Sequence, residues 1–298
     1  MMSFPQRLRH KPAAILLAVV LTCTAVGDTF AQEQTTPHEL VQKTVDNELK
    51  SAKDSDNFMF RSRKQTSSGS QTKLMVQTRE ATAGMLVAVN DQPLTPEQLR
   101  AEEGRLRNLI HNPDELKRKQ KQERDDAERI ARIMRALPDA FVYEYADEEK
   151  STKPEVKRDE GLVRLNFRSN PKYDPPTRVE QVLAGMKGFL LIDPKAHRIA
   201  QIDGTLFKDV GFGWGILGHL DKGGRFQVSQ AKIENGDWAI TRMRLNFTGK
   251  VLLFKRITIK NEESFSDFRR VPRNLSFAEG VALLKKHGVS ENANRSGE

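Results

Sequence analysis

The sequence predicts an α+β fold in which one large, curved antiparallel β-sheet forms a half-barrel with helices on its concave side. Three observations predict it. Short segments with period-two alternation fill most of the chain. Turn dipeptides such as Asn-Gly separate these segments at short intervals, which favours hairpins over strand–helix–strand units. Four capped helix starts stand outside the segments that alternate.

The four predicted helices begin with capping chemistry. Each start places an oxygen-bearing N-cap three residues before Glu or Gln, so that the cap and the third helical residue can accept each other's backbone N–H groups. The starts are Thr36-Pro37-His38-Glu39, Thr95-Pro96-Glu97-Gln98, Asn112-Pro113-Asp114-Glu115 and Ser276-Phe277-Ala278-Glu279. Apolar stripes predict packing of the first and last helices on the sheet: Leu40, Val41, Val45 and Leu49 on the first, Phe277, Val281 and Leu284 on the last. We expect the last helix to end at Gly288.

The segment 95–138 is a predicted helical insertion that carries many charges. Residues 97–135 include eleven basic and nine acidic side chains, and 117–126 contain no apolar residue. A solvated helix with i,i+4 ion pairs is the favoured interpretation, and a charged arm that contacts a partner is the alternative. Apolar residues resume at Ile130, Ile133, Met134 and Leu137, and we expect this end to dock on the sheet.

The other segments are predicted strands. In the first half they cover 57–66, 72–79, 85–90, 141–146 and 162–168, and in the second half 188–193, 198–207, 225–233, 238–247, 251–260 and 264–271. Turns are expected at Asp203-Gly204, Lys222-Gly223-Gly224, Asn235-Gly236 and Thr248-Gly249. Along 238–247, one face carries Ala239, Thr241, Met243, Leu245 and Phe247, and the other Arg242, Arg244 and Asn246. This alternation predicts a sheet with one dry and one wet side.

The first 31 residues are predicted to be a secretory signal peptide. Arg7, Arg9 and Lys11 precede an apolar run over 13–26, and Thr29-Phe30-Ala31 matches a small-residue cleavage site. The single cysteine, Cys23, lies inside this run, and the alternative that it is lipidated is disfavoured by Thr22 before it. The exported chain should therefore contain no thiol and hold together by its core.

The net charge argues against nucleic acid as a partner. The chain has 49 basic and 40 acidic side chains, and removal of 1–31 leaves 46 and 39, a net charge of +7. Such a modest excess favours solubility and weak attraction to anionic surfaces such as lipid headgroups. It is not the concentrated basic stripe of a nucleic-acid-binding protein.

No catalytic, metal-binding or cofactor site is predicted from residue spacing. The five histidines after the predicted leader are widely separated, namely His38, His111, His197, His219 and His287. No Gly-x-Ser-x-Gly elbow occurs, and no thiol nucleophile is left. A hydrolase is retained only as a third hypothesis, which requires His197 or His219 to converge with a carboxylate and an oxygen nucleophile in a cleft.

One glycine-rich segment has two interpretations. Residues 213–218 match G-x-G-x-x-G, but no helix is predicted after them, so dinucleotide binding is rejected. Phe212, Trp214, Ile216 and Leu217 among these glycines can form an adaptable apolar flap at a cavity or membrane surface. Core side chains in a strongly bent sheet explain the segment equally well.

Three short sequence segments resemble the LolA/LolB-like superfamily of bacterial envelope proteins. Members of this superfamily carry or accept lipoproteins, and relatives of the RseB sensor type belong with them. The three segments are Gly188-Phe189-Leu190-Leu191-Ile192-Asp193-Pro194, Arg198-Ile199-Ala200-Gln201-Ile202-Asp203-Gly204 and Gly236-Asp237-Trp238. The likeness covers roughly residues 36 to 271 as a plan of helix, strands and late meander. It implies one half-barrel domain over 32–289, without catalysis, followed by a polar tail at 290–298 that we expect to be disordered.

What the resemblance implies about function is a carrier or sensor for lipid or lipoprotein acyl chains, located in the periplasm or associated with the outer membrane. The expected apolar ligand contacts are Phe212, Trp214, Ile216, Leu217, Met243, Leu245 and Phe247. Peripheral membrane contact and a protein partner in the envelope are compatible with this expectation. The alternative is a periplasmic interaction or structural module that works through the charged helix 97–135.

Overall fold

The computed structural model describes residues 35–146, 161–212, 218–233, 236–251 and 255–295. In this part of the chain a 13-stranded antiparallel sheet is the central element, and it is not closed into a barrel. Helices account for about 36% and strands for about 43% of the structure. The predicted α+β class with a large curved antiparallel sheet is confirmed. The predicted signal peptide lies outside the described residues.

The sheet joins the first and last strands of the chain. Its strands are β1 Asn57–Thr66, β2 Gly69–Val76, β3 Ala83–Val89, β4 Gln92–Pro93, β5 Phe141–Tyr145, β6 Val163–Ser169, β7 Met186–Asp193, β8 Arg198–Leu206, β9 Val210–Phe212, β10 Gly218–Leu220, β11 Arg225–Lys232, β12 Trp238–Val251 and β13 Lys255–Val271. The order is β4-β3-β2-β1-β13-β12-β11-β8-β7-β6-β5, and β9 and β10 form a side branch on β12. Because β1 pairs with β13, the amino-terminal hairpin extends the later meander.

All four predicted helix starts are confirmed. The helices are α1 Pro37–Asp54, α2 Pro96–His111, α3 Pro113–Ala140, the short α4 Arg178–Gln181 with the 3-10 turn Leu183–Gly185, and α5 Phe277–Arg295. Thr36 and Thr95 form complete capping boxes with Glu39 and Gln98. Asn112 accepts the Glu115 N–H at 3.1 Å, and Ser276 exchanges hydrogen bonds with Glu279. These side chains satisfy backbone N–H groups that lack a partner within the helix.

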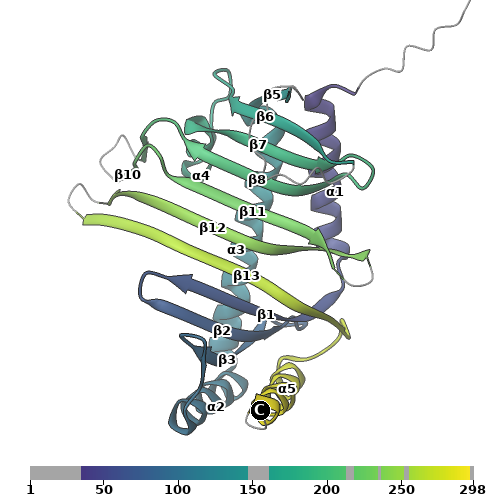
Figure 1. The fold of residues 1–298 in the computed structure, drawn as a ribbon, viewed down its shortest axis with the longest axis vertical. Helices are drawn as coiled ribbons and strands as arrows, with labels where there is room; N and C mark the ends of the chain where they lie inside the picture. The colour runs from purple at the N-terminus through teal and green to yellow at the C-terminus, as the bar shows by residue number, and fades with distance from the viewer. Residues whose placement is uncertain (1–34, 147–160, 213–217, 234–235, 252–254, 296–298) are drawn as a thin grey trace, which may run out of the picture. The chain divides into compact units, whose positions relative to one another are not determined.

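The helices cover opposite faces of the sheet in its two halves. Figure 1 shows α1 and α3 behind the sheet, crossing its strands, whereas α2 and α5 lie at the end formed by β1–β3. Consecutive strand residues point to opposite faces. Accordingly, Phe58 faces the α1–α3 side, whereas its neighbour Met59 packs into a second core with residues of α2 and α5 such as Leu106 and Leu284.

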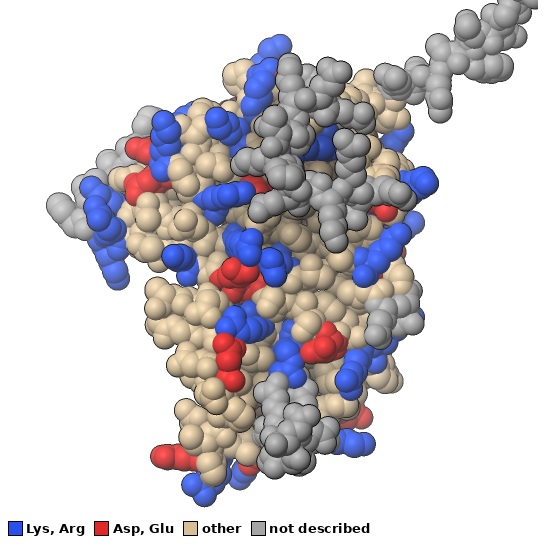
Figure 2. All heavy atoms as spheres, viewed as in Figure 1, with Lys and Arg blue, Asp and Glu red and all other residues tan. Residues whose placement is uncertain are grey.

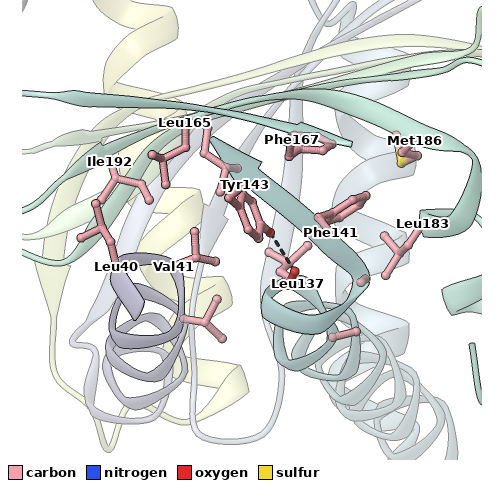
Figure 3. Packing of buried hydrophobic residues seen from close by; sticks show 14 of the residues in the cluster. Leu40, Val41, Leu137, Phe141, Tyr143, Leu165, Phe167, Leu183, Met186 and Ile192 are labelled. Atoms are coloured by element: carbon pink, nitrogen blue, oxygen red, sulfur yellow. Dashed lines mark hydrogen bonds between the residues drawn. The ribbon is translucent and has the colours of Figure 1, made fainter. Parts of the chain in front are cut away.

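The main core fills the space between β5–β8 and the two helices behind them (Figure 3). Leu40 and Val41 of α1 and Leu137 of α3 meet Leu165 and Ile192 of the sheet. The predicted apolar stripe of α1 is confirmed by this packing. The prediction that α3 docks by its last turns is confirmed for Ile133, Met134 and Leu137, but Ile130 is 62% exposed.

Tyr143 ties this core to the end of α3. Its hydroxyl donates to the Leu137 carbonyl at 2.7 Å, and both side chains are buried (Figure 3). Burial, with a smaller contribution from the charge of Asp139, raises the pKa of the Tyr143 phenol, so it stays a neutral donor.

Replacing Tyr143 with Phe is expected to lower the free energy of unfolding by about 1–2 kcal/mol, because the buried Leu137 carbonyl then lacks a donor. Urea denaturation measures this loss. Tyr145 offers a matched control, since its hydroxyl donates to the Thr35 carbonyl at 2.6 Å but the residue is 45% exposed. Tyr145→Phe should cost less than about 0.5 kcal/mol. Equal losses for the two variants would contradict a special role for Tyr143.

Two predicted turns are wrong because their glycines serve close packing instead. Asp203-Gly204 lies inside β8 and Thr248-Gly249 inside β12. Residues 255–260 and the predicted strand 264–271 belong to a single strand, β13, whereas Val251 ends β12. A Cβ at Gly204 would clash with the Phe226 ring, and one at Gly249 with the carbonyl oxygen of His219 on β10. These positions therefore need glycine for the approach of a neighbour rather than for a bend.

The predicted end of the last helix is also wrong, since α5 continues through Gly288 to Arg295. A Cβ at Gly288 would clash with the Met85 side chain, so this glycine lets α5 approach β3 closely. Residues 290–295 of the predicted tail belong to α5, and 296–298 lie outside the described residues.

The opposite face of the central strands is polar, as the alternation predicted. Figure 2 shows positive and negative side chains interspersed over the face turned away from α1 and α3. Arg244 donates to Glu262 at 3.0 Å, and this hydrogen bond lowers the pKa of that carboxyl. Arg225 likewise bonds Asp203 at 2.9 Å. The face is therefore wet and its charges are largely paired.

Candidate ligand-binding cavity

The inner face of the sheet and helices α1 and α3 enclose a cavity of about 990 Å³. This volume lies at the upper end of the ~300–1,000 Å³ typical of small-molecule sites. Residues from β6, β7, β8, β11 and β12 form its floor, and the second half of each helix forms its walls. The cavity thus lies on the concave side, where the sequence predicted the dry face of the sheet.

One end of the cavity is apolar. It is lined by Leu137, Phe141, Phe167, Leu183 and Met186, which are also members of the main core. Phe141 and Phe167 pack against each other in a tilted arrangement, with ring centroids 4.5 Å apart and an interplanar angle of 48°. This end therefore offers hydrocarbon and aromatic surface, which suits an apolar group of a ligand.

The other end is polar and lies beside α1, where β8 begins, β11 ends and β12 begins. Arg198 Nη2 lies 3.0 Å from Glu48 Oε2, and the side chains are only 13% and 10% exposed. Gln230 bonds both partners, donating to Glu48 and accepting from Arg198 at 3.3 Å each. Burial raises the pKa of Glu48, although the Ile199 N–H and the Arg198 charge act in the opposite direction.

Hydrogen bonds attach the second half of α1 to the β7–β8 hairpin. Asn47 Nδ2 donates to the carbonyls of Ala196 and His197 at 3.0 and 3.1 Å. The Ile199 N–H donates to Glu48 Oε1 at 2.8 Å. His197 adopts a positive φ of 47°, an uncommon conformation for a residue with a side chain, and so turns its carbonyl into this contact region. These hydrogen bonds therefore fix the second half of α1 against the β7–β8 hairpin.

Exposed apolar side chains border the cavity. Ile130 of α3 and Ile240 of β12 both line it, yet they are 62% and 40% exposed. Large apolar side chains in this position mark the cavity as open to solvent between α3 and β12. A ligand that covered this opening would bury both isoleucines.

The structure places the predicted ligand-contact residues in different surroundings. Met243 lines the cavity, whereas Phe247 packs against the main core next to Gly224. Leu245 is half-buried and does not line the described cavity. Phe212 is the last residue of β9, and its side chain, together with Trp214, Ile216 and Leu217, lies outside the described residues.

Trp238 and Ile240 are cavity residues that the sequence pattern did not identify. Ser229 pairs with Arg242 and Gln230 with Ile240, so Thr241 is an extra residue in β12. This bulge moves Ile240 onto the same face as Met243 and breaks the simple alternation assumed for 238–247. No local signal such as glycine marks Thr241, because the bulge depends on the partner strand.

Of the histidines named for the hydrolase hypothesis, His219 lies beside a carboxylate and a hydroxyl. His219 Nε2 lies 3.1 Å from Asp221, and the Thr248 hydroxyl donates to the same carboxylate at 2.6 Å. The hydroxyl thus donates to the acid and not to the imidazole, which differs from the nucleophile–histidine–acid order of a hydrolytic triad. In the described part of the chain no group of three or more His, Cys, Asp or Glu is arranged to hold a metal ion.

A scan against protein-family models, a search of curated proteins and a search of solved structures each found no match. Across the described ranges, no helix combines the length and apolar character needed to cross a bilayer. The geometry of the cavity is therefore the basis for assigning a function.

Proposed function

We propose that this protein binds an amphiphile with a long hydrocarbon chain, without catalysis, and acts as a carrier or sensor. The observation that carries the proposal is the cavity of about 990 Å³, whose apolar end is continuous with the core and whose opposite end is polar. A folded protein normally fills such a space with its own side chains, since interiors are close-packed. A ligand that buries its chain here would gain ~25 cal/mol for each Å² of apolar surface removed from water.

Residues 1–31 and the resemblance to the LolA/LolB-like superfamily add a location to this proposal. An exported chain of this class would meet lipids or lipoproteins in the periplasm or at the outer membrane. The ligand in that setting would be an acyl chain of a lipid or lipoprotein. The exposed Ile130 and Ile240 suit transfer from a membrane or a partner, because a chain can enter between them.

Ligand binding can be tested with N-phenyl-1-naphthylamine, a neutral fluorescent probe of apolar sites. We expect its fluorescence to rise on addition of the protein and to fall when hexadecanoic acid displaces it. Native mass spectrometry of the protein purified from its own cells should show bound lipid. Absence of probe binding together with a homogeneous ligand-free species would contradict the proposal.

The interaction-module alternative is weakened by how the charges of α3 are used. Lys121 bonds Asp125 at 2.6 Å, and Lys119 lies 2.8 Å from Glu123, both at i,i+4 spacing. The helix also supplies a cavity wall from Ala127 to Leu137. Deleting α3 would therefore remove the cavity as well, and a substitution on its charged face is the better test.

Exchanging the pair, Lys121→Asp with Asp125→Lys, is expected to leave probe binding within about twofold of the original. The pair is exposed, and surface ion pairs contribute only ~0–1 kcal/mol to stability. Titration with the naphthylamine probe checks this expectation. If the exchange abolished capture of a protein partner while lipid was never found, the interaction-module hypothesis would replace the present one.

A further inference from the structure

We infer that the polar end of the cavity is a headgroup site for an anionic oxygen group, and that the ligand class is a single-chain carboxylate such as a long-chain fatty acid. This inference rests on the proposed function, since it assumes that a hydrocarbon chain occupies the apolar end. It also assigns an orientation to the ligand, in which the headgroup lies beside α1 and the hydrocarbon chain extends toward Phe141 and Met186.

The first support is that apolar and charged lining residues lie at opposite ends of the cavity, along the direction of the strands. Because Met186 pairs with Leu206, the start of β7 lies next to the end of β8, at the apolar end. Figure 1 shows the start of β8, the end of β11 and the start of β12 beside α1. Arg198, Lys232 and Trp238 belong to these strand ends, and both cations lie within 6.0 Å of the Trp238 ring centroid. A cavity that is apolar at one end and charged at the other fits a molecule with the same asymmetry.

The second support is that two cations at the polar end are incompletely paired. Lys232 Nζ is 4.0 Å from Asp193, at the limit of an ion pair, and this side chain is 59% exposed. Arg198 contacts Glu48 and Gln230 through Nη2, and its buried Nε has no hydrogen-bond partner among the described residues. Both cations flank the Trp238 ring, with Arg198 Cζ at 6.0 Å and Lys232 Nζ at 5.7 Å from its centroid.

Two carboxylates at this end already face the cations, since Glu48 lies 3.0 Å from Arg198 and Asp193 4.0 Å from Lys232, and the other acidic groups have partners of their own or are exposed. Arg270 lies 3.2 Å from Asp56 and also bonds Asp237, and Arg273 lies 2.9 Å from Asp56. Asp54 is exposed on the last turn of α1, where water and salt screen its charge. An incoming carboxylate would therefore meet Lys232 and Arg198 as the cations available to it. Hydrogen bonds between such cations and a carboxylate are stronger than neutral ones.

The test compares two ligands of equal chain length, hexadecanoate and hexadecan-1-ol, as competitors of N-phenyl-1-naphthylamine. Lys232→Gln removes the exposed cation and Arg198→Gln the buried one. Each is expected to weaken hexadecanoate about tenfold, equivalent to ~1.4 kcal/mol, and to leave hexadecan-1-ol within about twofold. Arg244→Gln, on the opposite face of the sheet, is the control and should change neither ligand.

The outcomes separate this inference from the proposed function. If hexadecan-1-ol and hexadecanoate bind equally well and Lys232→Gln affects neither selectively, the headgroup site is wrong while the apolar cavity stands. Tighter binding of hexadecyltrimethylammonium than of hexadecanoate would also overturn it. If no ligand displaces the probe, the proposed function itself fails. Should Arg198→Gln fold poorly because Glu48 loses its partner, Lys232→Gln still decides the question.

Discussion

Val228→Trp should reduce binding of N-phenyl-1-naphthylamine and of hexadecanoate by at least about tenfold. Val228 is half-buried on β11, lines the cavity, and pairs with Ile202 on one side and Met243 on the other. An indole at this position would occupy space that the ligand otherwise fills. Excluding an apolar group of leucine size forfeits ~1.5–3 kcal/mol of burial, and ~1.4 kcal/mol corresponds to a factor of ten.

The same substitution should leave the fold intact. Overpacking costs ~1–3 kcal/mol where a core is already full, but here the added volume enters an existing cavity. Gln227→Trp is the matched control, because Gln227 is the preceding residue and its side chain pairs with Arg244 on the opposite face. Circular dichroism and urea unfolding establish that both variants are folded. Undiminished binding by a folded Val228→Trp protein would show that the ligand does not occupy this cavity.

The sequence was sufficient to predict most helices and strands but not to predict the residues that line the cavity. Capping residues and alternation act over three or four neighbours, and they predicted the starts of α1, α2, α3 and α5 and the one-sided sheet, but not the short helix α4. The wrong turns at Gly204 and Gly249 have a different origin, since a glycine is needed equally by a turn and by a close neighbour. Only the partner that approaches each glycine distinguishes these cases, and the partner is not local in sequence.

The polar end of the cavity depends entirely on long-range contacts. Glu48 meets the N–H of Ile199, a residue 151 positions away, and Gln230 is 182 positions from Glu48. No spacing rule links such positions, and a single sequence offers no record of which of them vary together. Glu48 lies seven residues after Val41 and three after Val45, on the buried side of α1, so helical spacing indicates its burial but not the partners of its charge. Trp238 was missed for the related reason that the bulge at Thr241 is set by pairing with β11.

Glu48→Ala should lower the free energy of unfolding by about 3 kcal/mol, one of the largest losses expected from any polar substitution in this protein. The change leaves the Arg198 charge without its partner and the Ile199 N–H without an acceptor. Removing one member of a buried ion pair typically costs ~3–5 kcal/mol, and the lower end applies because both side chains keep some contact with water. Urea denaturation at neutral pH measures the loss.

A double substitution tests the cause of that loss. Glu48→Leu with Arg198→Leu removes both charges, and we expect it to recover at least half of the stability lost in Glu48→Ala, because apolar residues often replace a buried pair without penalty. Equal losses for the single and double variants would show that packing of α1, and not the orphaned guanidinium, is responsible. The double variant should bind hexadecanoate more weakly than the original protein does, as Arg198→Gln should, since both lack the Arg198 cation.

The pH dependence of stability gives a second, independent check on Glu48. Burial raises its folded-state pKa above the ordinary value of 4.5, so the folded protein holds this proton more tightly than the unfolded chain. The stability that protonated Glu48 contributes to the folded protein is therefore fully present below about pH 4.5. It is lost as the pH rises through the raised pKa of Glu48 in the folded state. The Gln side chain of the Glu48→Gln variant cannot titrate, so its stability lacks this pH dependence. As the pH rises above about 4.5, the original protein should therefore lose unfolding free energy relative to the variant. A difference that is constant from pH 4 to 7 would mean that water reaches Glu48 freely, and the polar end of the cavity would then be more open than its 10% exposure indicates.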